Sequence, residues 1–472
     1  MTVPASIEQL LKKHNISYSL ANLSAVPIHQ LVGDVKSIEQ PHQAQSANAH
    51  LLQNPNNEKL LAITPKQTIL DLEAVKEALG EPYTPIVGEA LKKFTQSLGL
   101  DAMVAVPKLG NLPTIVDKSL LSTDKLLLSV GGIDNQHIEL DGESFKKLLE
   151  STIINEIAIP LDTLNQATPQ HLDVKEISQS VEKFTELRIK QRLDETLELP
   201  PLPATAKAII KLRVDPNADV SDLCEVIELD PILAAQVVSW ASSPYYSAPG
   251  TIKSVHDAIV RVLGFEMVLS LALGLALGST LKLPTRRPEG CLSYWQQAVY
   301  VSTCTEAVIS CMPREQRPSY GCAYLSGLLH NFGYLLIAEI FSGQFDAICT
   351  EIDANTHAIP QSVEKHLIGV TRDQLAAWLM EIWHMPEEVC SAIRHQSNSE
   401  YTGEHAEYAQ LIYITRRLLN EKGVRTGVSD EPIPDALFER FALNKTEASE
   451  AIDIMLESTE MLEAMTKQMS PS

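Results

Sequence analysis

The sequence predicts a multidomain protein: an α+β domain with a mixed, curved sheet, followed by an all-α helical bundle. The chain has 472 residues, which is too long for one ordinary hydrophobic core. Short β-rich runs alternate with helical patterns up to residue 155, whereas helical periods dominate from residue 204 to about 467. Hydrophobic residues make up 44% and charged residues 21% of the chain, which is typical of globular proteins.

The N-terminal domain, residues 1–155, is predicted from short runs in chain order. The helical segments are "SIEQLLKKHN", "DLEAVKEALG" (71–80, ended by Gly80), "VGEALKKFTQSLG" and the closing "ESFKKLLE". The strand segments are "LLAITP" (60–65), "AMVAV", "LPTIVD", "KLLLSVGG" and "HIELDG".

We expect residues 156–198 to form a linker that contains an amphipathic helix. Apolar residues recur there at steps of three and four, at Ile177, Val181, Phe184 and Leu187. The following "LELPPLP" cannot continue a helix, because proline lacks the amide hydrogen and clashes with the preceding turn. The helical domain is then expected over 199–400, with a helical extension over 401–472.

Local signals also place helix ends in the second half. "DVSDLCEVIELDPILAAQVVSWASSP" predicts two helices with caps at Ser221 and Asp230, and Gly264 ends a third. The most apolar run, Met267–Gly278, is too short to span a bilayer and predicts a buried core helix.

Charge and cysteine content limit the function. The formal net charge is -22, and the first arginine is Arg188, so we expect neither a membrane surface nor strong tRNA binding. The seven cysteines form no CxxC pair and the N-terminus resembles no secretory signal, so we expect a cytoplasmic protein with free thiols.

The helical half resembles the HDOD family. The resemblance lies in the segments "LPPLPATAKAIIKL", "IELDPILAAQVVSWASSPYYSAPGTIKSVHDAIVRVLG" and "LSGLLHNFGYLLIAEI". The family usually has Asn-Ser where this chain has Ser242-Ser243. The resemblance implies a bacterial signal-transduction module related to HD-domain metal phosphohydrolases.

The same resemblance assigns the metal-ligand positions of HD hydrolases to Gln297, His330, Asn331, Arg372 and His395. Neutral amides are weak ligands, and arginine is a permanent cation. At about 5 Å, its charge and a divalent ion repel by roughly 6–7 kcal/mol at an effective dielectric constant of about 20. We therefore expect no metal, no cofactor and no catalytic residue. His330 is then either a hydrogen-bonded core residue or, with Asn331, Arg372 and His395, part of an anion pocket.

The N-terminal half resembles the YbaK-type editing domain, which also occurs inserted in prolyl-tRNA synthetases. The similarity lies in "LLAITPKQTILDLEAVKEALG" and in "LPTIVDKSLLSTDKLLLSVGGIDNQHIELDGESFKKLLE". It implies an aminoacyl-tRNA deacylase fold. The family's functional lysine is absent, because no lysine lies between Lys36 and Lys59. Val104 and Ala105 stand where the family has glycines.

Two further features of this half have alternative interpretations. His50 is either a substitute base or, as we favour, a structural histidine. The "SVGG" run, with Ser129, Gly131 and Gly132, is either a strand-end turn or the remnant of a small-ligand pocket.

Together these features predict a non-catalytic regulatory protein, a pseudoenzyme with protein partners in a signalling pathway and room for a small-molecule or nucleotide ligand. The alternatives are an aminoacyl-tRNA deacylase in the N-terminal domain and an HD-type metal-dependent phosphohydrolase.

Overall fold

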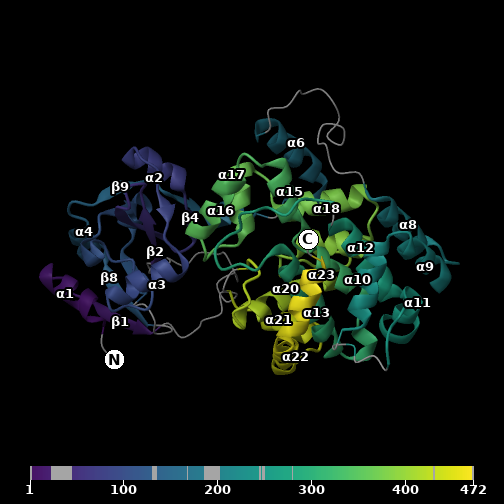
Figure 1. Ribbon diagram of the computed structural model, residues 1–472. Helices are drawn as coiled ribbons and strands as arrows, with labels where there is room; N and C mark the ends of the chain where they lie inside the picture. Colours follow the sequence, from purple (N-terminus) through teal and green to yellow (C-terminus); the bar gives the residue numbers. More distant parts are fainter. Residues whose placement is uncertain are drawn as a thin grey trace, which may run out of the picture. The chain divides into compact units, whose positions relative to one another are not determined.

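The computed structural model divides into two compact units (Figure 1). The N-terminal unit contains residues 1–166 together with 347–358, and the helical unit contains 167–346 and 359–472. The structure describes residues 3–22, 45–129, 136–166, 168–184, 202–243, 246, 250–278, 280–428 and 431–469.

The N-terminal unit contains a mixed sheet, as predicted. Its strand order is β1-β8-β7-β2-β3-β6-β9, with β5 also paired to β2. The β2/β7, β3/β6 and β6/β9 pairs are parallel and the others antiparallel. A second sheet pairs β10 with β4. The strands are β1 Ser19–Asn22, β2 Gln45–Gln53, β3 Lys59–Pro65, β4 Thr68–Leu70, β5 Thr84–Pro85, β6 Thr114–Asp117, β7 Lys125–Ser129, β8 Gln136–Asp141, β9 Ile153–Asn155 and β10 Ala158–Pro160.

Local chemistry decides the ends of α2, which we predicted over 71–80. The Asp71 side chain accepts hydrogen bonds from the amides of Glu73 and Ala74, and Gly80 ends the helix with φ 79°. The described helices of this unit are α1 Ala5–Lys13, α2 Leu72–Leu79, α3 Gly88–Ser97, η2 Leu109–Asn111, η3 Lys118–Ser122, α4 Gly142–Leu148 and α5 Leu161–Leu164, with most of α16, Phe345–Ala354.

The strand predicted for "AMVAV" is wrong. Residues 102–106 have no ladder partner, and the Val106 amide instead donates to the Val104 carbonyl at 2.8 Å. Val104, Ala105 and Val106 are nevertheless buried in the core. The apolar run therefore reflects burial of an irregular segment.

The helical unit contains no β-strand among its described residues. Its helices are η4 Gln170–Leu172, α6 Asp173–Phe184, α8 Ala204–Val214, α9 Val220–Glu228, α10 Pro231–Ala241, α11 Val255–Ala258, η6 Ile259–Leu263, α12 Phe265–Gly278, α13 Tyr294–Ser310, η7 Arg314–Gln316, α14 Tyr320–Leu329, α15 Phe332–Ile340, the start of α16, α17 Pro360–Ile368, α18 Arg372–Ile382, α19 Glu387–His395, α20 Ala406–Glu421, α21 Asp435–Arg440, α22 Lys445–Glu457 and α23 Thr459–Met469.

Several predicted features of this unit are confirmed and one is wrong. Asp230 caps α10 and Gly264 follows η6 with φ 81°. Asp219, rather than Ser221, caps α9, because it forms a capping box with Asp222.

Helix α12 forms the apolar centre of the helical unit. Its residues from Met267 to Gly278 are all buried, as predicted, and it packs against α14. Among the described helices, none is both long and apolar enough to cross a membrane.

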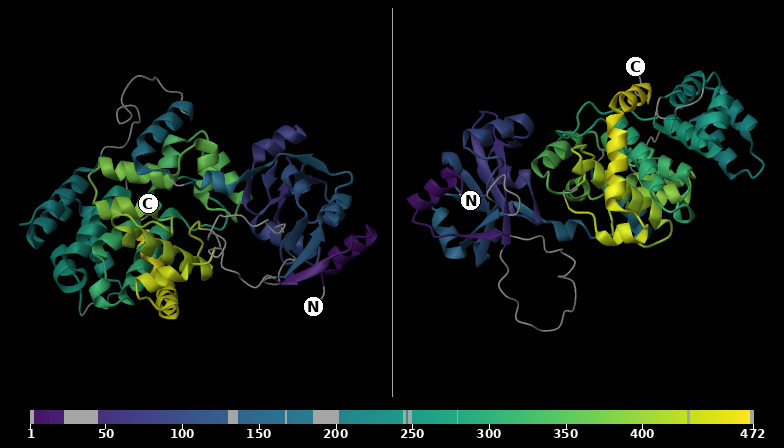
Figure 2. Two further views of the ribbon diagram at one scale, coloured as in Figure 1. Left: turned by 180° about the vertical axis from the view of Figure 1, so that it is seen from behind. Right: turned by 90° about the horizontal axis from the view of Figure 1, so that it is seen from below.

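Segments before and after residues 199–400 also pack on this bundle. Helix α6 contacts α18 and buries Ile177 and Val181, and α20 packs against α13, α14 and α19. Helices α22 and α23, yellow in Figure 2, contact α13. Helix α20 thereby contributes side chains to the interior of the bundle.

Candidate functional site

The positions that the HD pattern singled out lie at helix ends inside the bundle. Helix α14 ends at Leu329, His330 follows it, and Asn331 immediately precedes α15. Arg372 is the first residue of α18, after the capping residue Thr371. Gln297 lies in the first turn of α13.

A glycine allows α15 to approach α18 closely. A Cβ atom at Gly333 would lie only 2.0 Å from the Arg372 carbonyl oxygen. The absence of a side chain at Gly333 therefore lets Arg372 lie beside Asn331. The guanidinium also lies over the Tyr334 ring, 5.3 Å from its centroid.

Arg372 forms a buried ion pair. Its Nε donates to Glu364 Oε1 at 2.5 Å and its Nη1 to Asn331 Oδ1 at 3.0 Å, while its backbone amide donates to Glu364 Oε2 at 2.8 Å. The Asn331 amide nitrogen in turn donates to Gln297 Oε1 at 3.2 Å. Burial alone would lower the pKa of Arg372, but the Glu364 carboxylate raises it above its ordinary value. Arg372 is therefore charged, and both its Nε and its Nη1 are hydrogen-bonded.

A second buried pair of charges adjoins the first. Gln396 Nε2 donates to Asp373 Oδ1 at 3.0 Å, and Gln361 Nε2 and Ser397 Oγ donate to Oδ2 at 3.1 and 3.0 Å. Arg416 Nη1 donates to Gln396 Oε1 at 2.9 Å. Burial raises the pKa of Asp373 against the opposing charge of Arg416. Burial also lowers the pKa of Arg416 to about 10.

These side chains constitute what we call the ion cluster: Gln297, Asn331, Gln361, Glu364, Arg372, Asp373, Gln396, Ser397 and Arg416. Its two guanidinium groups balance its two carboxylates. Glu364 and Arg372 form a direct ion pair, whereas Gln396 bridges Asp373 and Arg416, so each ionised group lies near an opposite charge.

His330 borders the ion cluster as a neutral side chain. Its Nδ1 donates to the Gly327 carbonyl oxygen at 2.7 Å, and its own carbonyl accepts from Gln396 Nε2 at 2.6 Å. Burial, with a smaller contribution from Arg416, lowers the pKa of His330 to about 3. Its Nε2 is buried and has no hydrogen-bond partner among the described residues.

His395, the fifth position, lies apart from this hydrogen-bonded group. Its ring stacks on Tyr401 with centroids 3.7 Å apart and planes 9° apart. Burial lowers the pKa of His395 to about 4. No hydrogen bond joins its ring to the other four positions among the residues that the structure describes.

The donor set does not fit a divalent metal ion. Within the described ranges, no group of three or more His, Cys, Asp or Glu side chains could hold one. The Asn331 oxygen already accepts from Arg372, and Gln297 already accepts from Asn331. A guanidinium therefore takes the place at which a ligand would need to offer a lone pair.

Sequence reasoning missed the residues that complete the ion cluster. Glu364, Asp373, Gln396 and Arg416 are distributed over α17, α18, α20 and the end of α19. A usable signal was present at Arg416, a charged residue within the apolar "LIYITRRLL". Charged residues are rarely buried without a partner, so such a residue indicates a buried counterion.

The structure describes only some of the residues that the sequence singled out in the N-terminal unit. Gly131 and Gly132 lie outside the described residues, as does the side chain of Ser129. The His50 ring is buried, its Nδ1 donating to the Ala354 carbonyl at 2.8 Å and its Nε2 accepting from Thr64 Oγ1 at 2.9 Å. Burial lowers the pKa of His50 to about 3. Both nitrogens are engaged, as a structural histidine requires.

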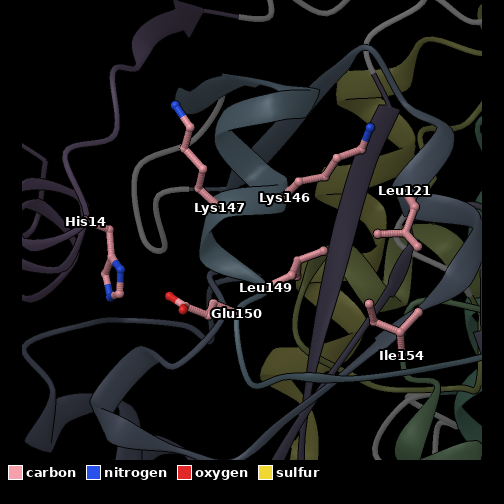
Figure 3. A pocket seen from close by; sticks show the side chains of 7 residues that line it. All are labelled: His14, Leu121, Lys146, Lys147, Leu149, Glu150 and Ile154. Carbon is pink, nitrogen blue, oxygen red and sulfur yellow. The ribbon is translucent and has the colours of Figure 1, made fainter.

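A surface hollow of about 580 Å³ lies on the N-terminal unit (Figure 3). Lys146 and Lys147, both exposed, form part of its rim, and Lys146 pairs with Glu143 at 3.0 Å. None of the residues singled out from the sequence lines it; the lining residues are His14, Leu121, Lys146, Lys147, Leu149, Glu150 and Ile154. Its solvated rim lacks the convergent buried polar groups of a small-ligand site.

Known proteins resemble the chain at several levels. Residues 199–399 match the HDOD domain family. An uncharacterized protein of Treponema pallidum (strain Nichols) is 24% identical over 224 residues, which is 48% of this chain and 41% of that protein. The chain thus matches less than half the length of that relative.

Two solved structures extend the comparison. An HDOD domain protein with unknown function from Geobacter sulfurreducens is 18% identical, covers 64% of this chain and 99% of its own, and shares the fold with a TM-score of 0.50. A candidate signal transduction protein from Marinobacter aquaeolei VT8 is 37% identical over 100% of both chains, with a TM-score of 0.88. Residues 199–399 therefore belong to the HDOD domain family, and the chain is similar over its full length to the Marinobacter protein.

Proposed function

We propose that this chain is a non-catalytic signal-transduction protein in which a self-neutralised ion cluster replaces the HD-type metal centre. The observation that carries the proposal is the Arg372 guanidinium, bonded to both Glu364 and Asn331. Metal-dependent hydrolysis needs a cation that lowers the pKa of a bound water. Arginine supplies charge but no coordination site, so no nucleophile can be generated this way.

The neighbouring groups offer no substitute chemistry. His330, with a pKa of about 3, is too weak a base to abstract a proton from water at neutral pH. Both carboxylate oxygens of Asp373 accept hydrogen bonds, from Gln396, Gln361 and Ser397. Its carboxylate therefore serves to join helices of the bundle. The proposed role is therefore the transmission of a state to protein partners.

For the N-terminal unit we propose a YbaK-related domain that no longer deacylates aminoacyl-tRNA. The mixed sheet and the order of its helices agree with this relationship. Both ring nitrogens of His50 are engaged, and Val104 and Ala105 are buried side chains where a close substrate approach would need glycine. Such a domain would serve as a ligand- or partner-sensing input.

Metal content and hydrolysis test the first proposal. Purified full-length protein is incubated with Mn²⁺ or Mg²⁺, desalted and analysed for metal, and is then tested for phosphate release from nucleotides. We expect metal well below one equivalent and no turnover above buffer. The triple variant Gln297→His/Asn331→Asp/Arg372→His restores ligands of the HD type and should retain more Mn²⁺ than the wild type.

Either of two results would overturn the proposal. One is stoichiometric metal on the wild-type protein. The other is phosphate release that Asn331→Ala abolishes while the protein stays folded by circular dichroism. The proposal for the N-terminal unit has its own test, which is hydrolysis of Ala-tRNA(Pro) and Cys-tRNA(Pro). Rapid ester cleavage that a His50 substitution abolishes would refute it.

A further inference from the structure

Residues 347–358 belong to the N-terminal unit although the chain on both sides of them belongs to the helical unit. The segment comprises most of α16 and the turn that follows it. We call residues 347–358 the docking segment. Ile348, Cys349, Glu351 and Asn355 in it are buried. Ala354 of this segment packs among buried apolar residues that otherwise all belong to the N-terminal unit.

Side chains of the docking segment form hydrogen bonds with backbone groups of strand β4. Asn355 Oδ1 accepts from the Leu70 amide at 2.7 Å, and Asn355 Nδ2 donates to the Leu70 carbonyl at 2.9 Å. His357 Nε2 donates to the Thr68 carbonyl at 2.7 Å. Thr68 and Leu70 are alternate residues of one strand, so these groups lie along the same edge of β4. Asn355 and His357 thus replace a missing neighbouring strand.

Three further contacts make this docking specific. The Ala354 carbonyl accepts from His50 Nδ1 at 2.8 Å, and Glu351 Oε1 accepts from the Leu72 amide at 3.2 Å. Ala354 also packs in the apolar cluster that contains Leu52 and Leu70. Unpairing these groups would leave buried donors and acceptors without partners, which carries a free-energy cost.

The docking segment is joined directly to the ion cluster through the chain. Only Ala358 and Ile359 separate His357 from the first residue of α17, Pro360. The same short helix supplies Gln361, which binds Asp373, and Glu364, which binds Arg372. A change in the position of residues 355–358 must therefore be absorbed within the chain that leads to Glu364.

We propose that the docking segment is the internal coupling element of this protein: its attachment to β4 fixes the start of α17 and so the pairing of Glu364 with Arg372. A ligand or partner that displaces the segment from β4 would loosen the ion cluster. This inference rests on the proposed signalling function, because it names the path by which the N-terminal unit acts on the HDOD domain.

The test is hydrogen–deuterium exchange of the full-length protein, comparing wild type with Asn355→Ala. The variant removes both bonds to Leu70, so local opening should make the amides of residues 68–72 exchange about tenfold faster. Coupling predicts that exchange also rises over residues 360–375, which include the Arg372 amide bonded to Glu364. Exchange in the core of α12 should not change.

Thr356→Ala is the matched control, because Thr356 is an exposed residue of the same segment. It should leave both regions unchanged. Faster exchange at 68–72 with unaltered exchange at 360–375 would refute the coupling, and unaltered exchange at 68–72 would refute the docking. If Asn355→Ala does not fold, His357→Ala removes only the bond to Thr68 and is measured in the same way.

Exchange is measured without any substrate, so the two proposals can fail separately. Discovery of bound metal or of hydrolysis would overturn the non-catalytic function and leave the exchange result valid. Loss of the exchange pattern would remove the coupling path and leave the metal analysis valid.

Discussion

Replacing Arg372 by methionine isolates the charge of the ion cluster, because methionine keeps much of the side-chain volume. The Glu364 side chain is 0% exposed and would lose its buried counterion. It would then take up a proton rather than remain ionised. Protonating a carboxyl group of ordinary pKa at pH 7 costs roughly 4 kcal/mol, which sets an upper limit on this part of the loss. The lost hydrogen bond to Asn331 adds about 1 kcal/mol.

We therefore expect Arg372→Met to lower the free energy of unfolding by about 3–5 kcal/mol at pH 7, the range found when one partner of a buried pair is removed. The loss should depend on pH. In the variant the folded-state pKa of Glu364 lies above its unfolded value, so stability falls as pH rises. At pH 5 the cost of protonation is only about 1 kcal/mol, and the variant should recover most of its deficit.

Urea unfolding followed by tryptophan fluorescence provides the measurement. All four tryptophans, Trp240, Trp295, Trp378 and Trp383, lie in the helical unit, so the signal reports that unit alone. The control is the double variant Arg372→Met/Glu364→Gln, in which no buried charge is left unpaired. It should be more stable than Arg372→Met alone at pH 7. A loss below about 1 kcal/mol that is the same at pH 5 and pH 7 would refute the buried ion pair.

Three further changes test other parts of the site. Gly333→Ala should destabilise the protein by about 2–3 kcal/mol in the same urea assay, because its Cβ would meet the Arg372 backbone, whereas Gly343→Ala, with open space around it, should be neutral. Burial raises the pKa of Glu306 to about 7, so the free energy of unfolding should fall as the pH rises from about 4.5 to 7. Glu306→Gln should make this fall smaller in a series of urea measurements. The pKa of His330 is lowered to about 3, so between pH 6.5 and 3 only the unfolded state binds a proton at this ring and the free energy of unfolding falls as the pH falls. His330→Leu should remove this contribution, which is about 1.4 kcal/mol per pH unit.

The architecture was predictable where local chemistry decides it. Asp71 and Asp230 each cap a helix with their own side chains, and Gly80 and Gly264 adopt the positive φ that ends one. Helix α9 differed because several capping residues occur within a few positions, and sequence alone does not choose between them. The "AMVAV" run was mistaken for a strand because an apolar run records burial without specifying a ladder partner.

The candidate site was predictable only in part. The resemblance to HD hydrolases indicated Gln297, Asn331 and Arg372, which the structure joins by hydrogen bonds. It could not indicate Glu364 or Arg416, because neither occupies a motif position and their pairing depends on how four helices pack. The docking segment had no sequence signal at all, since its Asn355 and His357 side chains bind a strand about 285 residues earlier in the chain.

The ion cluster is better explained by specificity than by stability. Four buried charges contribute little net free energy, because desolvation offsets most of their attraction, and apolar residues of equal volume would serve a static core as well. A paired guanidinium instead favours one arrangement strongly over its neighbours, since any shift of Glu364 away from Arg372 leaves both charges buried and unpaired. Glu364 lies seven residues beyond His357, which binds β4. The pairing of Glu364 with Arg372 is either complete or strongly unfavourable, and it lies near the contact between the docking segment and β4. These are the properties of a two-state element. Under the proposed function, the ion cluster would report whether the docking segment is bound to β4.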